Sequence, residues 1–222
     1  ARGEQGRGVY VDIRDPEAAM QAVAELQEQT DLVLLEEFVE GQDLRIIVID
    51  GEAVAAAIRR PAEIEGDGKL SVAELIEKQS RRRAAATGGE SHIPLDAETE
   101  RCLTAAGLSK ESVLEEGRRL AVRKTANLHT GGTIHDVTDR LDPALAEAAV
   151  KAAEVLHMPV VGFDFMVEAP DRPLYHVIEA NERPGLANHE PAPTAARFID
   201  LYFPETRSER LPLRGKHAKT GD

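Results

Sequence analysis

The chain has 222 residues, and 42% of them are hydrophobic, so it is long and apolar enough to bury the core of one large domain or two small ones. Its 27 basic and 40 acidic residues give a formal charge of −13, which argues against nucleic acid or an anionic membrane as its main partner. The single cysteine, Cys102, excludes an internal disulfide framework and is typical of a reducing compartment. With no signal peptide and no apolar run near the ~20 residues that cross a bilayer, we expect a cytoplasmic protein.

The first part of the chain is expected to contain a loop, a helix and several strands. Residues 1–8 predict a glycine-containing loop, and 9–13 predict a short strand. Pro16 occupies a favourable first helical position for a helix over 17–29. Further strands are expected at 32–39, 43–50 and 53–60, the last two joined by an Asp50-Gly51 turn.

The second part alternates helices with short extended segments. Ser71, followed by Glu74 three positions later, forms a capping box that predicts a helix over 72–82. The remaining patterns predict helices at 96–106, 109–116, 143–156 and 193–202, a strand at 119–124 and a glycine-rich loop at 127–133. Antiparallel hairpins with interspersed helices predict an α+β fold. From about residue 206 the chain is polar and charged, which is typical of a flexible tail.

The most informative segment is a hairpin of two acidic strands, residues 160–168 and 175–181. If it closes symmetrically, with Glu168 opposite Tyr175, then Asp164 faces Glu179. Side chains alternate along a strand, so Asn181 shares the face of Glu179. Two like charges directly opposed across a ladder are destabilising, and a hard divalent cation is the natural compensation.

The donors Asp164, Glu179 and Asn181 offer oxygen ligands only, which favours Mg²⁺ or Mn²⁺ over zinc. Magnesium is usually held by a few carboxylates together with substrate phosphates, so the site suggests a nucleotide. The plain alternative is a pair of solvated carboxylates at a sheet edge. A glycosidase acid/base pair is a further alternative, although directly opposed carboxylates suit that geometry poorly.

Three other segments have residues suited to nucleotide chemistry. Consecutive N–H groups around Gly3, Gly6 and Gly8 suit a phosphate, although the same residues also suit an ordinary loop. In the segment 34–45, backbone groups near Val39 suit an adenine edge and Asp43 suits ribose hydroxyls; a hairpin with solvated acids is the alternative. The third set holds cations and small polar residues suited to a phosphate or carboxylate clamp, or singly to surface ion pairs: Arg45, Arg59, Arg60, Arg123, Lys124, Asn127, Gly131 and Gly132.

These motifs, in this order, resemble the ATP-grasp ligase superfamily: a glycine loop before a strand, Glu-Glu-Phe-Val-Glu-Gly-x-Asp at 36–43, Gly-Phe-Asp at 162–164 and Glu-Ala-Asn-x-x-Pro-Gly-Leu at 179–186. The resemblance covers nearly the whole chain. Residues 66–76 and 123–133 are similar to cyanophycin-synthetase-type ligases. Residues 58–63, 79–91 and 181–191 resemble most closely the ligase half of the N-acetylglutaminylglutamine synthetases, which make a dipeptide that becomes an osmoprotectant.

The resemblance implies that ATP phosphorylates a carboxylate, that an amine attacks the acyl phosphate, and that an amide forms. Small-molecule amino-acid or dipeptide substrates are implied, and a homo-oligomer is compatible with the sequence. The resemblance assigns the site residues by role. Asp164, Glu179 and Asn181 would hold magnesium; Glu36, Glu37 and Val39 would line adenine; Asp43 would bind ribose; Gly6 and Gly8 would cover the phosphates; the N–H of Gly185 would stabilise the oxyanion; and Arg59 and Asn127 would lie near the transferred phosphate or the acceptor carboxylate.

The resemblance also has departures that bear on function. D-alanine–D-alanine ligases have an arginine where this chain has Gly162, so that role would pass to Arg59, Arg60 or Arg123. The phosphate-contacting lysine of the family normally precedes the glycine loop, where this sequence starts. We therefore expect an ATP-grasp fold lacking its N-terminal part, with a partial lid subdomain at 1–60, a C-terminal subdomain with the metal site at 61–205 and a tail at 206–222. Such a fragment is expected to be inactive alone; a catalytically silent nucleotide-binding module is the alternative.

Overall fold

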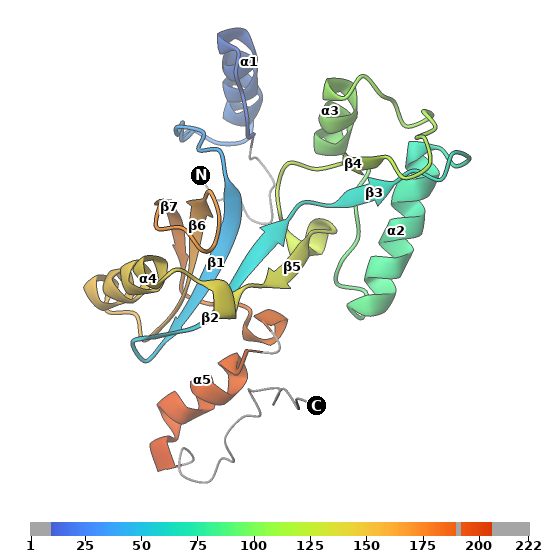
Figure 1. Cartoon of the computed structure of the whole chain (residues 1–222). Helices are drawn as coiled ribbons and strands as arrows, with labels where there is room; N and C mark the ends of the chain where they lie inside the picture. The colour runs from blue at the N-terminus through green and yellow to red at the C-terminus, as the bar shows by residue number, and fades with distance from the viewer. Residues whose placement is uncertain (1–9, 190–191, 206–222) are drawn as a thin grey trace, which may run out of the picture.

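A five-stranded antiparallel sheet forms the centre of the structure, a computed structural model that describes residues 10–189 and 192–205 (Figure 1). Its strands follow the order β5-β2-β1-β6-β7. Their bounds are β1 (Gln42–Ile49), β2 (Glu52–Arg60), β5 (Thr133–Asp136), β6 (Val160–Val167) and β7 (Tyr175–Asn181). The two predicted hairpins, β1–β2 and β6–β7, therefore lie side by side, joined by the pairing of β1 with β6.

The two faces of the sheet are covered by different helices. Leu44, Ile46 and Val48 of β1 point to a core that packs against α4 (Pro143–Leu156), which begins at Pro143 after the capping side chain of Asp142. Ile47 and Ile49 point the other way, into a smaller apolar cluster. That cluster includes residues of α5 (Thr194–Tyr202). Because side chains alternate along β1, Asp43 and Arg45 lie on the α5 side of the sheet.

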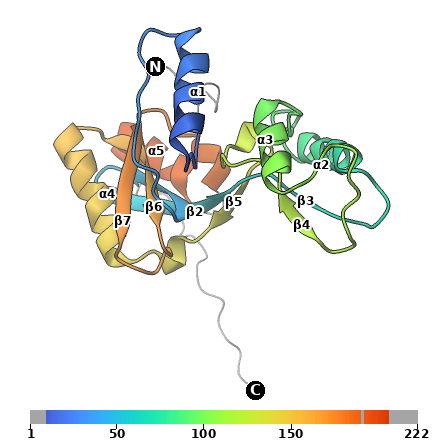
Figure 2. The same ribbon diagram turned by 90° about the horizontal axis from the view of Figure 1, so that it is seen from above.

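A second, smaller unit is inserted between β2 and β5 (Figure 2). It contains the two-stranded sheet of β3 (Glu63–Glu65) and β4 (Arg119–Ala121), with α2 (Val72–Ala86) and α3 (Ala97–Ala105). Its apolar side chains form a core of their own, which includes Ile64, Ile76 and Leu103. The predicted capping box is present at the start of α2. This unit can therefore act as a firm support for the loop that leads from β4 back to the main sheet.

The remaining elements connect these parts. Helix α1 (Pro16–Gln27) begins after the Asp15 cap and stands apart from the main sheet (Figure 1). Three short 3₁₀ turns are η1 (Leu128–Thr130), η2 (Thr138–Arg140) and η3 (Leu186–His189). In the described part of the chain, no helix is both long and apolar enough to cross a membrane.

The α+β prediction is confirmed, with corrections to individual elements. Residues 10–13 and 32–39 are not strands, because neither segment finds a partner strand among the described residues. Residues 109–116 form turns and an isolated bridge rather than a helix, and the strand predicted at 119–124 ends at Ala121. Strand β5 was not predicted, since only four residues of it pair with β2.

The predicted subdomain boundary at residue 60 falls at the end of β2, which pairs in the same sheet as β6 and β7 through β1. Segments from both sides of that boundary thus share one sheet, and the division into a lid and a C-terminal subdomain stays a prediction. The predicted tail, 206–222, and the candidate phosphate residues Gly6 and Gly8 lie outside the described residues.

Candidate functional site

The acidic hairpin forms as predicted at its functional end. Asp164 on β6 is the register partner of Glu179 on β7. Nearer the turn the predicted register is wrong, because Tyr175 faces Val167 rather than Glu168. The cause is a β-bulge in which Ile178 has no partner, so the two strands are offset by one residue on either side of it.

The three candidate metal ligands lie together on this hairpin. The Nδ2 group of Asn181 donates to Oε1 of Glu179 at 3.0 Å and lies 3.5 Å from Oδ2 of Asp164. Asp164 is 4% exposed, whereas Glu179 on the edge strand is exposed. The hairpin therefore combines one buried carboxylate with one exposed carboxylate and an amide between them.

Two arginine side chains face the buried carboxylate of Asp164 and balance its charge. Arg45 on β1 directly opposes Asp164 and donates through Nε and Nη2 at 2.7 and 2.8 Å. Arg59 on β2 lies with its Nη2 2.8 Å from Oδ2 of Asp164. Arg59 also binds Asp43, its own register partner, through Nε and Nη2 at 2.8 and 2.9 Å. Charged side chains on three adjacent strands thus form one connected network.

The electrostatics of this network follow from burial and from pairing. Burial alone would raise the pKa of Asp164, but the hydrogen bond from Arg45 and the charges of Arg59 and Arg45 lower it below its ordinary value. Burial disfavours the charged form of Arg59, yet the carboxylates of Asp164 and Asp43 raise its pKa overall. For Asp43 burial is the stronger influence and raises the pKa in spite of Arg59. Asp164 is therefore the carboxylate held most firmly in its ionised form.

The donor set fits a magnesium or manganese ion in its chemistry. Asp164 and Glu179 offer carboxylate oxygens, and Asn181 offers an amide oxygen when its side-chain amide is turned by 180°. No group of three or more His, Cys, Asp or Glu side chains suited to a metal occurs among residues 10–189 and 192–205, so the amide is needed to complete the set. A carboxylate has about four lone-pair positions, and arginine N–H groups contact three of those of Asp164.

A cavity of about 550 Å³ adjoins this network, which is a size that suits a small organic ligand. Its lining brings together the β1–β2–β6–β7 site, the segment before β1 and the loop after β4. The predicted candidate residues that line it are Val39, Asp43, Arg59, Arg60, Lys124, Asn127, Asp164 and Glu179. Other lining residues, such as Phe38, Phe165 and Ile178, make part of the wall apolar. The cavity therefore joins segments that were proposed separately to hold a nucleotide and a metal.

Other predicted site residues lie elsewhere. Glu36 and Glu37 are exposed in an irregular segment and do not line this cavity. The side chain of Asn127 caps η1, with Oδ1 accepting from the N–H of His129 at 2.9 Å, so its Nδ2 group is the part left to contact a ligand. Gly185 lies exposed just before η3, in the turn that follows β7.

The Pro-Gly turn is anchored on the sheet at the position where the resembling ligases have an arginine. A Cβ atom built on Gly162 would lie 2.9 Å from Cβ of Pro184 and 3.2 Å from Cδ1 of Ile47. Glycine is thus needed at position 162 because Pro184 occupies the space above it. This contact places Gly185 over the strand that carries Asp164, two residues further along.

Two buried side chains near the site, Arg123 and His189, have surroundings that the sequence did not predict. Arg123 was a candidate for the missing arginine role, but it is 3% exposed and binds Asp96, Glu98 and Thr99 of the α3 region. The sequence pattern around His189 indicates no ligand spacing and only a surface or core residue, and the structure places it in the interior. It is 4% exposed, and its Nδ1 atom has no hydrogen-bond partner among the described residues. Its pKa is lowered to about 4 by burial and by the charges of Arg45 and Arg59, which places it close to the charged network.

The chain is similar to known proteins both in sequence and in structure. No protein-family model matches the chain. A cyanophycin synthetase from Nostoc sp. (strain PCC 7120 / SAG 25.82 / UTEX 2576) is 32% identical over 234 residues, which cover 98% of this chain and 26% of the relative. The glutathione biosynthesis bifunctional protein GshAB from Clostridium perfringens (strain 13 / Type A) is 28% identical over 194 residues, covering 86% of this chain and 23% of the relative.

The decisive structural comparison is with a bifunctional glutathione synthetase from Pasteurella multocida. The two structures align with a TM-score of 0.61 and 25% identity, over 87% of this chain and 28% of the other. The chain has the ATP-grasp fold. It spans about a quarter of the length of the curated relatives described above. The ATP-grasp fold predicted from the motifs is thus confirmed, while the activity of a whole protein is a separate question.

Proposed function

We propose that the chain is part of an ATP-dependent carboxylate–amine ligase that forms an amide bond through an acyl phosphate. The observation that carries this proposal is the cavity of about 550 Å³, whose wall contains Asp164, Glu179 and Arg59 together. Oxygen ligands for a divalent cation and a guanidinium group for an anion then lie at one small-molecule site. Similarity to cyanophycin synthetase over 98% of the chain supports the same reaction class.

The hairpin residues Asp164, Glu179 and Asn181 would hold the magnesium ion. When bound there, magnesium would supply positive charge that offsets the charge of the phosphates. Asp164 would keep part of its contact with Arg45, since this arginine holds the carboxylate ionised in the ligand-free arrangement. Glu179 would supply the more adaptable ligand because its side chain is exposed.

The rest of the cavity suits the nucleotide and the substrates. Val39 would lie along the adenine ring. Asp43 would accept a hydrogen bond from a ribose hydroxyl in place of one that it accepts from Arg59. Arg59, released from part of its pairing, would then contact the transferred phosphate or a substrate carboxylate. Nδ2 of Asn127 would donate to the transferred phosphate or to the acceptor carboxylate, and the backbone N–H of Gly185 would donate to the oxyanion that develops during acyl transfer. Glu36, Glu37, Gly6 and Gly8 keep their proposed nucleotide roles on the resemblance alone.

Two substrate assignments follow from different observations. The residues at 58–63, 79–91 and 181–191 favour N-acetylglutamine and glutamine, which would give an osmoprotectant dipeptide. The 32% identity to cyanophycin synthetase favours a cyanophycin-type amino-acid ligase as the second candidate. In both cases an amine attacks an activated carboxylate, so the proposed roles of Asp164 and Glu179 are the same.

The test is substrate-dependent release of ADP by the full-length protein, with ATP and Mg²⁺ present. N-acetylglutamine with glutamine is one substrate pair, and a free amino acid with cyanophycin is the other. Release with the first pair supports the dipeptide assignment, and release with the second supports the alternative. If ATP binds but no pair stimulates ADP release, the chain belongs to a silent nucleotide-binding module and the ligase proposal is wrong.

A further inference from the structure

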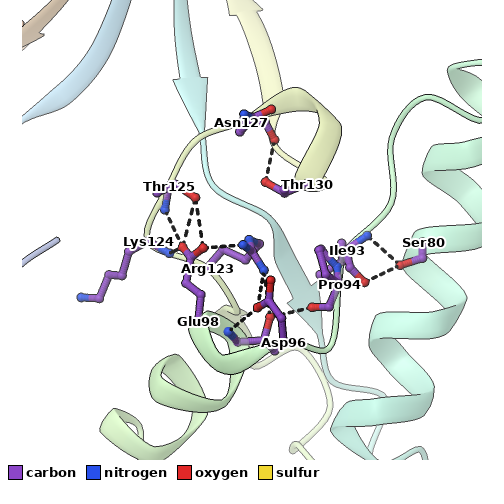
Figure 3. Close-up of polar contacts among 11 residues, drawn as sticks. Ser80, Ile93, Pro94, Asp96, Glu98, Arg123, Lys124, Thr125, Asn127 and Thr130 are labelled. Carbon is purple, nitrogen blue, oxygen red and sulfur yellow. Dashed lines mark hydrogen bonds and ion pairs between the residues drawn. The ribbon is translucent and has the colours of Figure 1, made fainter. Parts of the chain in front are cut away.

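The loop between β4 and η1 borders the cavity but is held from behind by α3 (Figure 3). Arg123, the second residue after β4, extends into the small unit instead of the cavity. Its Nη1 group donates to Oδ1 of Asp96 at 2.9 Å and to Oγ1 of Thr99 at 3.2 Å, and its Nη2 group binds Oε2 of Glu98. This arginine thus connects the loop to the first turn of α3.

Both carboxylate oxygens of Glu98 bind the loop that follows β4 (Figure 3). While Oε2 pairs with Arg123, Oε1 accepts from the backbone N–H of Lys124 at 3.0 Å and of Thr125 at 3.1 Å. It also accepts from Oγ1 of Thr125 at 3.0 Å. Two successive backbone N–H groups that converge on one anion fix the orientation of the peptide plane between them.

Glu98 is well placed to hold the loop still. Its side chain is 11% exposed, and it lies in the first turn of α3, where the helix dipole favours a negative charge. Leu103 on the same helix is buried in the core of the small unit, so the helix cannot shift freely. Glu98 therefore connects a helix that is fixed by the core to the part of the cavity wall formed by Lys124 and Thr125.

The consequence concerns four successive residues that line the cavity, Lys124–Asn127. Lys124 provides an ammonium group, which contacts Asp12 at 2.9 Å, and Asn127 provides an amide. An ammonium and an amide donor that line the same cavity suit an anionic group of a substrate, such as a carboxylate. Where that group can bind depends on the backbone position of residues 124 and 125, which Glu98 sets.

We propose that Glu98 is a positioning residue: it binds the N–H groups of Lys124 and Thr125 and thereby holds the Lys124–Asn127 wall in place for an amino-acid substrate. This inference rests on the proposed ligase function, but Glu98 itself lies outside the cavity lining. It links the small unit, inserted between β2 and β5, to substrate binding. The small unit would then act on the affinity for the amino acid rather than on the binding of nucleotide at the hairpin.

The first test is Glu98→Gln in the full-length protein, with Glu100→Gln as matched control. Glu100 is on the same helix, is exposed, and pairs only weakly with Lys110 at 3.2 Å. We expect Glu98→Gln to raise KM for the amino-acid acceptor about tenfold, because charge-assisted hydrogen bonds are lost. The KM for ATP should stay within about twofold of wild type. Glu100→Gln should leave both values unchanged. Equal KM values in Glu98→Gln and wild type, or equal rises for ATP and acceptor, would overturn the proposal.

The second test does not need activity. Backbone amide exchange at Lys124 and Thr125 should be at least about tenfold faster in Glu98→Gln than in wild type, because both N–H groups lose their ionised acceptor. Unchanged exchange would show that Glu98 does not hold the loop. If Glu98→Gln does not fold, Thr125→Ala serves instead, since it removes one hydroxyl contact and should raise the acceptor KM about twofold. A wild-type protein that releases no ADP with any substrate pair overturns the ligase function, whereas the exchange result decides the role of Glu98.

Discussion

Arg45 on β1 binds both carboxylate oxygens of Asp164, the residue that directly opposes it on β6. The pairing explains how a buried carboxylate is tolerated beside the second acid of the hairpin, Glu179. The guanidinium group of Arg45 balances the negative charge of Asp164. Arg59 binds both Asp164 and Asp43 and so includes Asp43 in the same network. A metal ion that binds at the hairpin would therefore join a network in which arginines already balance the charge of Asp164.

Replacing Asp164 with Asn should destabilise the fold. Asn keeps the shape but removes the buried negative charge, so Arg45 and Arg59 are left facing only Asp43. Breaking a buried pair on one side costs about 3 kcal/mol in the free energy of unfolding. Urea unfolding of the ligand-free protein would measure it. Asp171→Asn is the control, because Asp171 is an exposed residue 3.5 Å from Arg140 and should change stability by less than about 0.5 kcal/mol. An Asp164→Asn protein as stable as wild type would contradict the network.

Replacing Glu179 with Gln should act on metal use rather than on stability. The side chain is exposed on an edge strand, so the free energy of unfolding should change by less than about 0.5 kcal/mol. The loss of one oxyanion ligand should raise the Mg²⁺ concentration for half-maximal ADP release by about tenfold or more. Glu168→Gln is the matched control on the same hairpin, since its carboxylate pairs only with exposed Arg172. Identical Mg²⁺ titrations of wild type and Glu179→Gln would remove Glu179 from the site.

The pairing of Asp164 with Glu179 was predicted from a symmetric closure of the hairpin that the structure does not have. The pair forms because the bulge at Ile178 shifts the register by one residue and so brings Glu179 opposite Asp164. The two residues are joined by a short turn, and strand alternation alone places Asn181 beside them. The role of Arg45 was not predictable, because it depends on β1 pairing with β6, a contact between segments separated by more than 100 residues. Arg59 was singled out as a cation, but its carboxylate partners become visible only once the strand order is known.

Other expectations failed for related reasons. Leu32, Leu34 and Leu35 gave an apolar signal for a strand, but these side chains are exposed and find no partner strand among the described residues. Hydrophobicity alone does not make a segment a strand, because a strand also needs a neighbouring strand to which its backbone can hydrogen-bond. Arg123 carried the signal of a ligand-binding cation, yet three residues of the α3 region bind its two terminal nitrogen atoms. The acids at positions 96 and 98, spaced along the start of a helix, were the signal that could have suggested this.

The contact between Gly162 and Pro184 gives a steric prediction. An alanine at position 162 would place Cβ 2.9 Å from Cβ of Pro184, so the Pro-Gly turn must shift or the strand must bend. We expect Gly162→Ala to lower the free energy of unfolding by about 1–3 kcal/mol and to lower kcat, because Gly185 moves with Pro184. Thermal or urea unfolding and ADP release measure the two effects.

A double-mutant cycle isolates this contact. Pro184→Gly removes the Cβ atom that Gly162→Ala meets, so the double variant should lose less stability than the sum of the two single variants. Strict additivity would mean that the two positions do not press on each other. In that case the glycine at 162 would need another explanation, such as the contact with Ile47 at 3.2 Å.

His189 gives a prediction about pH. Burial, followed by the charges of Arg45 and Arg59, lowers its pKa to about 4 in the folded chain, whereas an unfolded histidine titrates near pH 6.5. Between these values the unfolded chain binds more protons, so the free energy of unfolding falls as the pH is lowered from about 6.5 to about 4. The part due to His189 is at most about 3 kcal/mol, from 1.36 kcal/mol per pKa unit. Above pH 6.5 this histidine contributes no pH dependence.

The measurement is urea unfolding of wild type and His189→Gln at several pH values between 4 and 7. The carboxylates titrate in both proteins, so the difference between the two curves reports His189 alone. As the pH is lowered from about 6.5 to about 4, the free energy of unfolding of wild type should fall relative to that of His189→Gln, since Gln binds no proton in either state. His176→Gln is the matched substitution control, because it replaces an exposed histidine on β7 with the same residue. Parallel curves for wild type and His189→Gln would show that His189 is not held neutral beside Arg45 and Arg59.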